Sequence, residues 1–329
     1  MKKTIYLHVG PHKTGTTVIQ KACLDNREVL DKYDVSYPSL FFNHIGHHDL
    51  VNTVRLREIS DKHLGQLEAI NSNILLSSEN FIHFTQQDLQ YLVGRFSKFD
   101  IKIIYSWRRS SLKMYSMWQE SIKHGEVASF HSFYYSDLVR PGQSKTLMQT
   151  LNVELLASKF GKDNLYILDF DSLSESNNLV KEFFDIVGVK GSEIDISTQS
   201  DGVRNESLDP RKTEMLRGLN ALSKGLGLPV SSKTREAFSM HYDTIIQEVE
   251  QVLSLMERYI ENVEVGNYLI DRSSEAGITQ KFMPNIRHYQ NKNRVKIIKI
   301  VNSDWLLNPL ASQLLAEIHK KIMGEVTQA

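Results

Sequence analysis

Short apolar runs alternate with longer amphipathic stretches through residues 4–190 of the chain. The apolar runs begin at Ile5, Ile74, Ile101 and Leu165, and each has the length of a buried strand. Between these runs, apolar side chains recur at helical spacing. Strand and helix in alternation predict a parallel sheet with helices on both faces. We therefore expect an α/β fold of three layers, with a central parallel sheet flanked by helices.

The predicted helices run from Thr16 to about Tyr33, over 51–70 and 85–97, through Leu112–Ile122, over 147–160 and up to Gly188. Beyond about residue 195 the alternation stops, and helices are predicted over 213–222, 234–260, 293–301 and 309–323. No internal repeat, low-complexity tract or clear linker divides the chain. We expect a single domain over 1–329, with an α/β core at 1–200 and a mainly helical C-terminal region at 201–329.

The first apolar run leads into a loop that contains two glycines and a lysine. Gly10 and Gly15 have the spacing of the P-loop pattern G-x-x-x-x-G-K-[ST], but Thr16 occupies the lysine position and Lys13 lies inside the loop. The loop amides and the following helix start, at Thr16 and Thr17, favour an anion. This predicts a P-loop-like nucleotide-phosphate site without the usual geometry for splitting a nucleoside triphosphate with magnesium. A glycine-rich turn without a ligand is the alternative.

Polar groups also follow the second and third predicted strands. Ligands of an open parallel sheet bind beyond the carboxyl ends of its strands, so Glu79 is expected to share a crevice with Lys13. A first-turn carboxylate of the next helix is the alternative role for Glu79. Ser116 lies eight residues after Arg108, and the two side chains could hold one phosphate. The alternative is a surface pair, Arg108 and Arg109, with a packed serine.

Three histidines, His44, His47 and His48, lie within five residues. Their spacing is not that of a helical zinc pair, and no carboxylate-rich partner is obvious, so we expect no metal site. A polar loop beside the site, or a helix start at His47, fits better, and one of these histidines could contact substrate. The aromatic stretch 125–145 predicts an ordered loop or short helices, with rings that suit sugar stacking or simple packing.

Composition mainly excludes certain partners, cysteine-based sites and membrane segments. The 329 residues carry a formal net charge of zero, which indicates neither nucleic acid nor an anionic membrane surface as a partner. Cys23 is the only cysteine, so an internal disulfide and a cysteine-based metal cluster are excluded. The apolar run after Met1 is too short for a signal peptide, and no stretch approaches the length of a membrane span. We expect a soluble, cytoplasmic protein.

Together these motifs resemble those of the sulfotransferases that use 3′-phosphoadenosine 5′-phosphosulfate (PAPS). The loop 10–17 is similar to the family's 5′-phosphosulfate loop, in the form found in bacterial carbohydrate sulfotransferases and heparan-type enzymes. Arg108 with Ser116 resembles the family's 3′-phosphate motif. Residues 165–173 resemble its later strand–helix unit, and 203–207 a polar segment before its C-terminal helices. The likeness covers about residues 4–222.

The resemblance implies a role for each matching residue. The 5′-phosphosulfate would be held by His12, Lys13, Thr14, Gly15, Thr16 and Thr17. Arg108 and Ser116 would hold the 3′-phosphate. Lys13 would act on the leaving group, and Glu79 would be the general base. PAPS would be the co-substrate and adenosine 3′,5′-bisphosphate the product, with no metal. The acceptor would be a carbohydrate or another hydroxyl or amine compound.

The sequence departs from the family pattern in two places. The proline that often follows the 3′-phosphate arginine is replaced by Arg109, and Glu79 stands where the soluble small-molecule branch has a histidine base. His47, His48 and His83 are therefore candidates for substrate contact and alternatives to Glu79 as base. Two other functions stay open. A small-molecule kinase should have lysine where Thr16 stands, and a non-catalytic nucleotide-binding module could keep the same loop.

Overall fold

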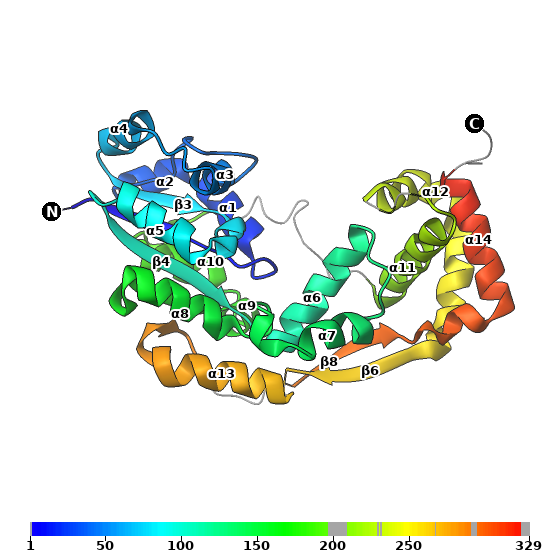
Figure 1. The fold of residues 1–329 in the computed structure, drawn as a ribbon. Helices are drawn as coiled ribbons and strands as arrows, with labels where there is room; N and C mark the ends of the chain where they lie inside the picture. Colours follow the sequence, from blue (N-terminus) through cyan, green and yellow to red (C-terminus); the bar gives the residue numbers. More distant parts are fainter. Residues whose placement is uncertain are drawn as a thin grey trace. The chain divides into compact units, whose positions relative to one another are not determined.

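A computed structural model describes residues 2–196, 209–228, 230, 232–266, 268–290 and 295–323. The chain divides into two compact units (Figure 1). The first unit comprises 1–110, 148–205 and 270–292, and the second comprises 111–147, 206–269 and 293–329. Both units take segments from either side of residue 200. The segment 203–207 lies outside the described residues.

The first unit is built on a six-stranded sheet in the order β2-β3-β1-β4-β5-β7. Its strands are β1 (Thr4–His8), β2 (Val35–Ser36), β3 (Asn73–Ser77), β4 (Asp100–Trp107), β5 (Leu165–Asp169) and β7 (Ile286–Arg287). Every neighbouring pair is parallel. The predicted α/β fold with a central parallel sheet is confirmed. The edge strands β2 and β7 were not predicted, because two residues are too few to form a pattern.

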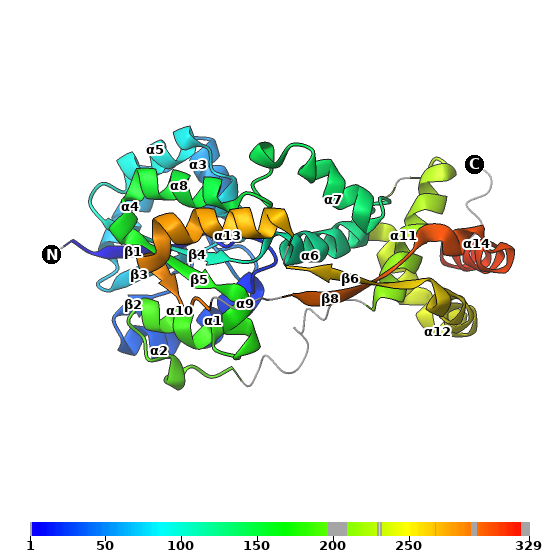
Figure 2. The same ribbon diagram turned by 90° about the horizontal axis from the view of Figure 1, so that it is seen from below.

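Helices cover both faces of this sheet (Figure 2). Alternate side chains of β1 enter different cores: Ile5 and Leu7 pack on one face, and Tyr6 packs on the other. The first core is completed by α3 (Asp49–Arg55), α4 (Asp61–Ala69), α5 (Gln86–Arg95), α8 (Gln149–Phe160) and α13 (Leu269–Phe282). The second is completed by α1 (Thr16–Asp25), α2 (Arg27–Lys32), α9 (Phe170–Glu175) and α10 (Leu179–Ile186).

Two predicted long helices are each divided into two. The stretch 51–70 forms α3 and α4, and α4 begins anew at Ser60, whose side chain accepts a hydrogen bond from the His63 amide in a capping box. The helix predicted from Thr16 to Tyr33 is interrupted at Asn26, which leaves helical geometry at φ −112°. Polar residues that can hydrogen-bond backbone groups therefore ended helices that the apolar spacing alone would continue.

The second unit contains five helices and a two-stranded antiparallel ribbon among its described residues. The helices are α6 (Ser110–Lys123), α7 (Phe130–Leu138), α11 (Pro210–Gly225), α12 (Ser232–Met256) and α14 (Pro309–Met323), and the ribbon pairs β6 (Ile260–Val265) with β8 (Lys296–Val301). Its core forms where α11, α12 and α14 pack around Trp305. Within the aromatic stretch 125–145 the structure has α7 and a short 3₁₀ turn (Pro141–Gln143), as predicted.

The helix predicted over 293–301 is wrong. Residues Lys296–Val301 form β8, and Ile297 is 64% exposed on the ribbon while Ile300 is buried. β-Branched residues dominate this segment, which favours extended backbone over helix. The apolar positions fit either period over so short a run, and pairing with β6 decided between them.

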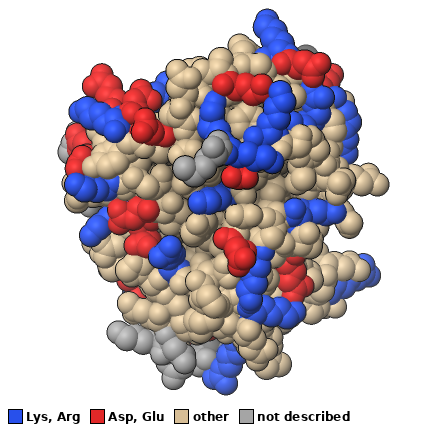
Figure 3. All heavy atoms as spheres, turned by 90° about the vertical axis from the view of Figure 1, so that its left-hand side faces the viewer, with Lys and Arg blue, Asp and Glu red and all other residues tan. Residues whose placement is uncertain are grey.

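Basic and acidic side chains are interspersed on the face in Figure 3. None of the helices in the described part of the chain combines the length and apolar character that crossing a bilayer requires. The same residues contain no group of three or more His, Cys, Asp or Glu side chains that could hold a metal ion.

Candidate functional site

The loop after β1 lies at the point in the sheet where the strand order reverses. β1 lies between β3 and β4; the chain runs from β1 to the β2–β3 side first and returns to β4 on the other side. In open parallel sheets a crevice forms at the carboxyl ends of such strands, and ligands bind there. Residues 9–15 follow the carboxyl end of β1. The sheet therefore positions the predicted phosphate loop between the ends of β3 and β4.

The loop backbone adopts left-handed conformations at three positions. Gly10, Lys13 and Gly15 have positive φ values of 77°, 63° and 77°. The buried Thr14 hydroxyl donates to the Pro11 carbonyl at 2.6 Å and so braces the loop from within. Gly15 precedes α1, and no side chain caps this helix start. The N-terminal end of a helix favours a bound anion, because its dipole and its first amides are directed toward that end.

The carboxyl end of β3 packs directly against the loop. A Cβ on Gly10 would lie 2.7 Å from the Glu79 Cα, so only glycine allows this approach. On the same side, His12 Nε2 lies 3.1 Å from Asn80 Oδ1. The half-buried Glu79 carboxylate accepts a hydrogen bond of 2.9 Å from Gln20 Nε2, which comes from α1. Glu79 is therefore held between the loop and the helix that follows it.

The carboxyl end of β4 contacts the loop from the other side. Arg108 Nη1 donates to the Lys13 carbonyl at 2.8 Å. Its guanidinium lies 5.0 Å from the centre of the Phe170 ring, and its Nε is 3.5 Å from Asp171 Oδ1. Burial lowers the pKa of Arg108 below its ordinary value, and the Asp171 charge opposes that shift. The arginine that was predicted to bind phosphate thus contacts the loop directly.

The neighbouring Arg109 is used differently. Its Nη2 contacts both carboxylate oxygens of Glu275, at 2.8 and 2.9 Å, and its side chain is 3% exposed. Tyr289 donates to the same carboxylate at 3.0 Å. Arg108 therefore contacts the loop, whereas Arg109 is enclosed in a buried ion pair.

The histidines near the site differ in what their ring nitrogens can do. The Ser77 amide donates to His47 Nδ1 at 3.1 Å, so the proton of His47 is on Nε2, which donates to the Pro38 carbonyl at 2.9 Å. Burial lowers the pKa of His47 to about 4. Both of its nitrogens serve the backbone, which leaves none for a substrate proton.

His48 and His83 lie closer to solvent. His48 is half-buried, and its Nδ1 lies 2.8 Å from the Ser78 hydroxyl, one residue before Glu79. His83 is exposed, with its ring centre 5.8 Å from that of His12. His48 therefore lies next to the residue before Glu79, and His83 lies next to His12 of the loop.

Ser116 is half-buried on α6 and belongs to the second unit, whereas Arg108 belongs to the first. Their joint role at one phosphate therefore remains a prediction from spacing.

Several side chains around the loop were not singled out by the sequence pattern. Gln20 is 1% exposed and occurs within the helical stripe of α1, where nothing in the periodicity marks it. Asp171 follows a predicted strand, so the rule that marked Glu79 could have found it. His8 is fully buried at the end of β1, where burial lowers its pKa to about 4 and the Glu79 charge opposes that shift; its Nδ1 lies 2.8 Å from the Ser77 hydroxyl.

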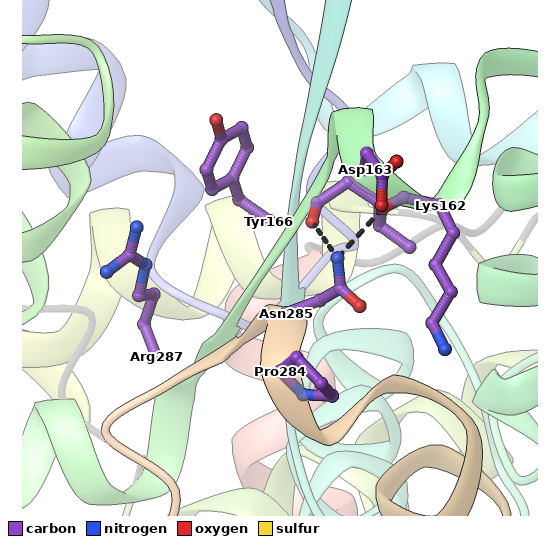
Figure 4. Close-up of a pocket in the computed structure, with 7 residues that line it drawn as sticks. Lys162, Asp163, Tyr166, Pro284, Asn285 and Arg287 are labelled. Atoms are coloured by element: carbon purple, nitrogen blue, oxygen red, sulfur yellow. Dashed lines mark hydrogen bonds between the residues drawn. The ribbon is translucent and has the colours of Figure 1, made fainter.

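A cavity of about 360 Å³ lies elsewhere, where β5 and β7 begin (Figure 4). Asn285 donates to the Lys162 and Leu165 carbonyls at its wall, at 2.8 Å each. The cavity is lined by Lys162, Asp163, Leu165, Tyr166, Pro284, Asn285 and Arg287. It opens at the amino ends of parallel strands, and in Figure 4 Tyr166 and Arg287 point away from Lys162. We therefore assign the candidate site to the loop at the opposite edge.

The chain resembles known proteins in structure. No protein-family model matches the chain, and no curated protein matches it in sequence. Among solved structures, a sulfotransferase from Alicyclobacillus acidocaldarius is similar with a TM-score of 0.41 and 14% sequence identity, over 71% of this chain and 100% of that one.

Proposed function

We propose that the chain transfers a sulfuryl group from PAPS to a hydroxyl or amine acceptor, with a carbohydrate or glycoconjugate as the favoured class. One observation carries this proposal: the loop 10–15 lies between a carboxylate, Glu79, at the end of β3 and a cation, Arg108, at the end of β4. An anionic donor with a separate 3′-phosphate needs a cradle and a second cation. An acceptor hydroxyl needs a base.

The residues present suit such a donor. The uncapped start of α1, with Thr16 and Thr17, and the loop amides would bind the 5′-phosphosulfate. Arg108 is the cation proposed for the 3′-phosphate, together with Ser116 by sequence spacing. Thr16 stands where a P-loop lysine would be, which argues against a magnesium-dependent kinase.

The proposed reaction is an in-line displacement at sulfur. Glu79 accepts the proton of the acceptor hydroxyl as the new oxygen–sulfur bond forms. The bond from sulfur to the bridging phosphate oxygen breaks, and Lys13 stabilises the charge that develops on that oxygen. The products are the sulfated acceptor and adenosine 3′,5′-bisphosphate. Of the three histidines considered as alternative bases, His48 is the first to test, because His47 has both nitrogens occupied and His83 is exposed.

A thermal-shift experiment separates the three candidate functions. The protein is melted alone, with adenosine 3′,5′-bisphosphate, and with ATP plus magnesium. Stabilisation by the bisphosphate and not by ATP is expected, because a ligand that binds only the folded state raises Tm. The reverse result would favour a kinase, and equal stabilisation without sulfate transfer would favour a binding module. A screen of labelled sulfate transfer from PAPS onto sugars, lipids and phenols then identifies the acceptor.

A further inference from the structure

Asp171 is a buried carboxylate next to the candidate site, and no role has yet been assigned to it. It lies in the first turn of α9, after β5, and its side chain is 2% exposed. Capping does not explain it, because Asp169 already caps α9 by accepting from the Ser172 amide at 3.2 Å. A buried carboxylate is costly unless it is paired, so its contacts indicate what it does.

The contacts of Asp171 link β5 to the end of β4. Its Oδ2 accepts a hydrogen bond of 2.9 Å from the Arg109 amide, and its Oδ1 lies 3.5 Å from Arg108 Nε. The Asp171 carboxylate thus contacts both the backbone of Arg109 and the guanidinium of Arg108. Asp171 therefore anchors the β4 end through the Arg109 amide and places a negative charge beside the Arg108 guanidinium.

The Arg108 guanidinium is bounded on three sides. Asp171 faces Nε, the Lys13 carbonyl accepts from Nη1 at 2.8 Å, and Cζ lies over the Phe170 ring, 5.0 Å from its centre. The side chain nevertheless remains 20% exposed. An arginine has five N–H donors, so this guanidinium is held by part of its donor set while some of its surface still faces outward.

We propose that Asp171 is a positioning residue that orients the Arg108 guanidinium toward the 3′-phosphate of the donor. This inference rests on the proposed function. In this role Asp171 does not contact the ligand. Its negative charge keeps the Arg108 side chain in one rotamer and offsets the cost of burying the guanidinium in part. Arg108 also contacts the loop through Lys13, so a correctly oriented Arg108 joins the two phosphate-binding regions.

The chain offers a matched control in the neighbouring pair. Arg109 and Glu275 form a comparable arginine–carboxylate pair one residue away, but the Arg109 side chain is only 3% exposed and the carboxylate that it pairs with lies on α13. Replacing Glu275 by glutamine therefore disturbs a buried pair at the same strand end without reaching the proposed phosphate-binding guanidinium.

The test is the gain in affinity that a 3′-phosphate provides. Calorimetry gives the Kd for adenosine 5′-phosphate and the Kd for adenosine 3′,5′-bisphosphate. The quotient of the first Kd divided by the second isolates the gain that the 3′-phosphate provides. Asp171→Asn should lower the quotient roughly tenfold, the scale of coupling between contacting charged groups. In an Arg108→Ala background, the same change should lower it no further. Glu275→Gln should keep the quotient within about twofold while lowering Tm.

Each other outcome overturns the inference. Equal weakening of both nucleotides by Asp171→Asn would mean a general structural role. A tenfold loss that persists without Arg108 would mean that Asp171 acts through another group. A wild-type protein that binds the bisphosphate no better than the monophosphate would overturn the proposed function as well. A clear wild-type preference that Asp171→Asn leaves unchanged would overturn this inference alone.

Discussion

Gln20 Nε2 donates a hydrogen bond to Glu79 Oε2 at 2.9 Å. The donor is a buried side chain of α1, and the acceptor is the carboxylate at the end of β3. The helix that starts at the proposed phosphate loop therefore also orients the proposed base. The same amide lies against Gly46, where an added Cβ would be 2.9 Å from Gln20 Nε2.

This contact predicts that Gln20 affects transfer without affecting donor binding. Gln20→Met removes the donor at similar volume and frees the Glu79 carboxylate to rotate. We expect kcat to fall about tenfold, the scale of one hydrogen bond to a charged group. The Kd for adenosine 3′,5′-bisphosphate should stay within about twofold. Glu79→Gln should show the same separation with a larger loss of kcat, by two orders of magnitude or so.

Both variants would be measured with the acceptor found in the transfer screen. Unchanged turnover in Glu79→Gln would move the base role away from Glu79, with His48 as the next candidate. A parallel loss of bisphosphate binding in Gln20→Met would instead indicate that the loop itself had been disturbed.

Lys13 is the proposed group for the leaving oxygen. Lys13→Ala should lower sulfate transfer by about two orders of magnitude or more, the scale for removing one preorganised electrostatic donor. The residue already has a positive φ of 63°, so alanine adds no backbone strain that lysine lacks. Lys32→Ala, at an exposed position in α2, is the control and should turn over normally. Near-normal turnover in Lys13→Ala would refute this role.

Gly10 is predicted to be intolerant of any side chain. Gly10→Ala combines a φ of 77° with a Cβ 2.7 Å from the Glu79 Cα, so we expect a loss of about 2 kcal/mol or more in the free energy of unfolding. Gly94→Ala, in α5 where the added Cβ would meet no atom within 4 Å apart from the helix's own nearby backbone, should instead stabilise by about 0.5–1 kcal/mol. Urea denaturation measures both, and a similar effect of the two substitutions would contradict the close packing of Gly10.

Buried histidines predict a loss of stability in mild acid. Burial lowers the pKa values of His8 and His47 to about 4 from an ordinary 6.5, so the folded state takes up their protons less readily than the unfolded state does. Above about pH 6.5 both histidines are neutral in the folded and in the unfolded state, so their burial carries no protonation cost. The destabilising effect of their burial grows as the pH falls toward 4, to about 3 kcal/mol per histidine.

Urea denaturation at pH 7 and at pH 4.5 measures this loss. His47→Gln should be less stable than the wild type at pH 7, because the backbone hydrogen bonds of His47 are disturbed. The same variant should lose less stability between the two pH values, since one protonation site is gone. An equal loss in both proteins would show that His47 is not buried as described.

The sequence by itself determined the loop and the four central strands of the sheet. The apolar runs that begin at Ile5, Ile74, Ile101 and Leu165 became β1, β3, β4 and β5, because continuous apolar runs of this length are stable when both faces of a strand are covered. Gly10 and Gly15 marked a strand-to-helix turn with positive φ. Topology rules then located Glu79 and Arg108 at one edge of the sheet, since the carboxyl ends of parallel strands meet there.

Only the tertiary structure decided what the neighbouring polar side chains do. Arg108 and Arg109 are adjacent and chemically equal in the sequence, yet one contacts the loop and the other pairs with Glu275, which is distant along the chain. Gln20 and Asp171 acquire their partners from other strands and helices, and β8 becomes a strand because β6 lies beside it. These outcomes depend on long-range contacts, and local periodicity carries no information about which partner a polar side chain will meet.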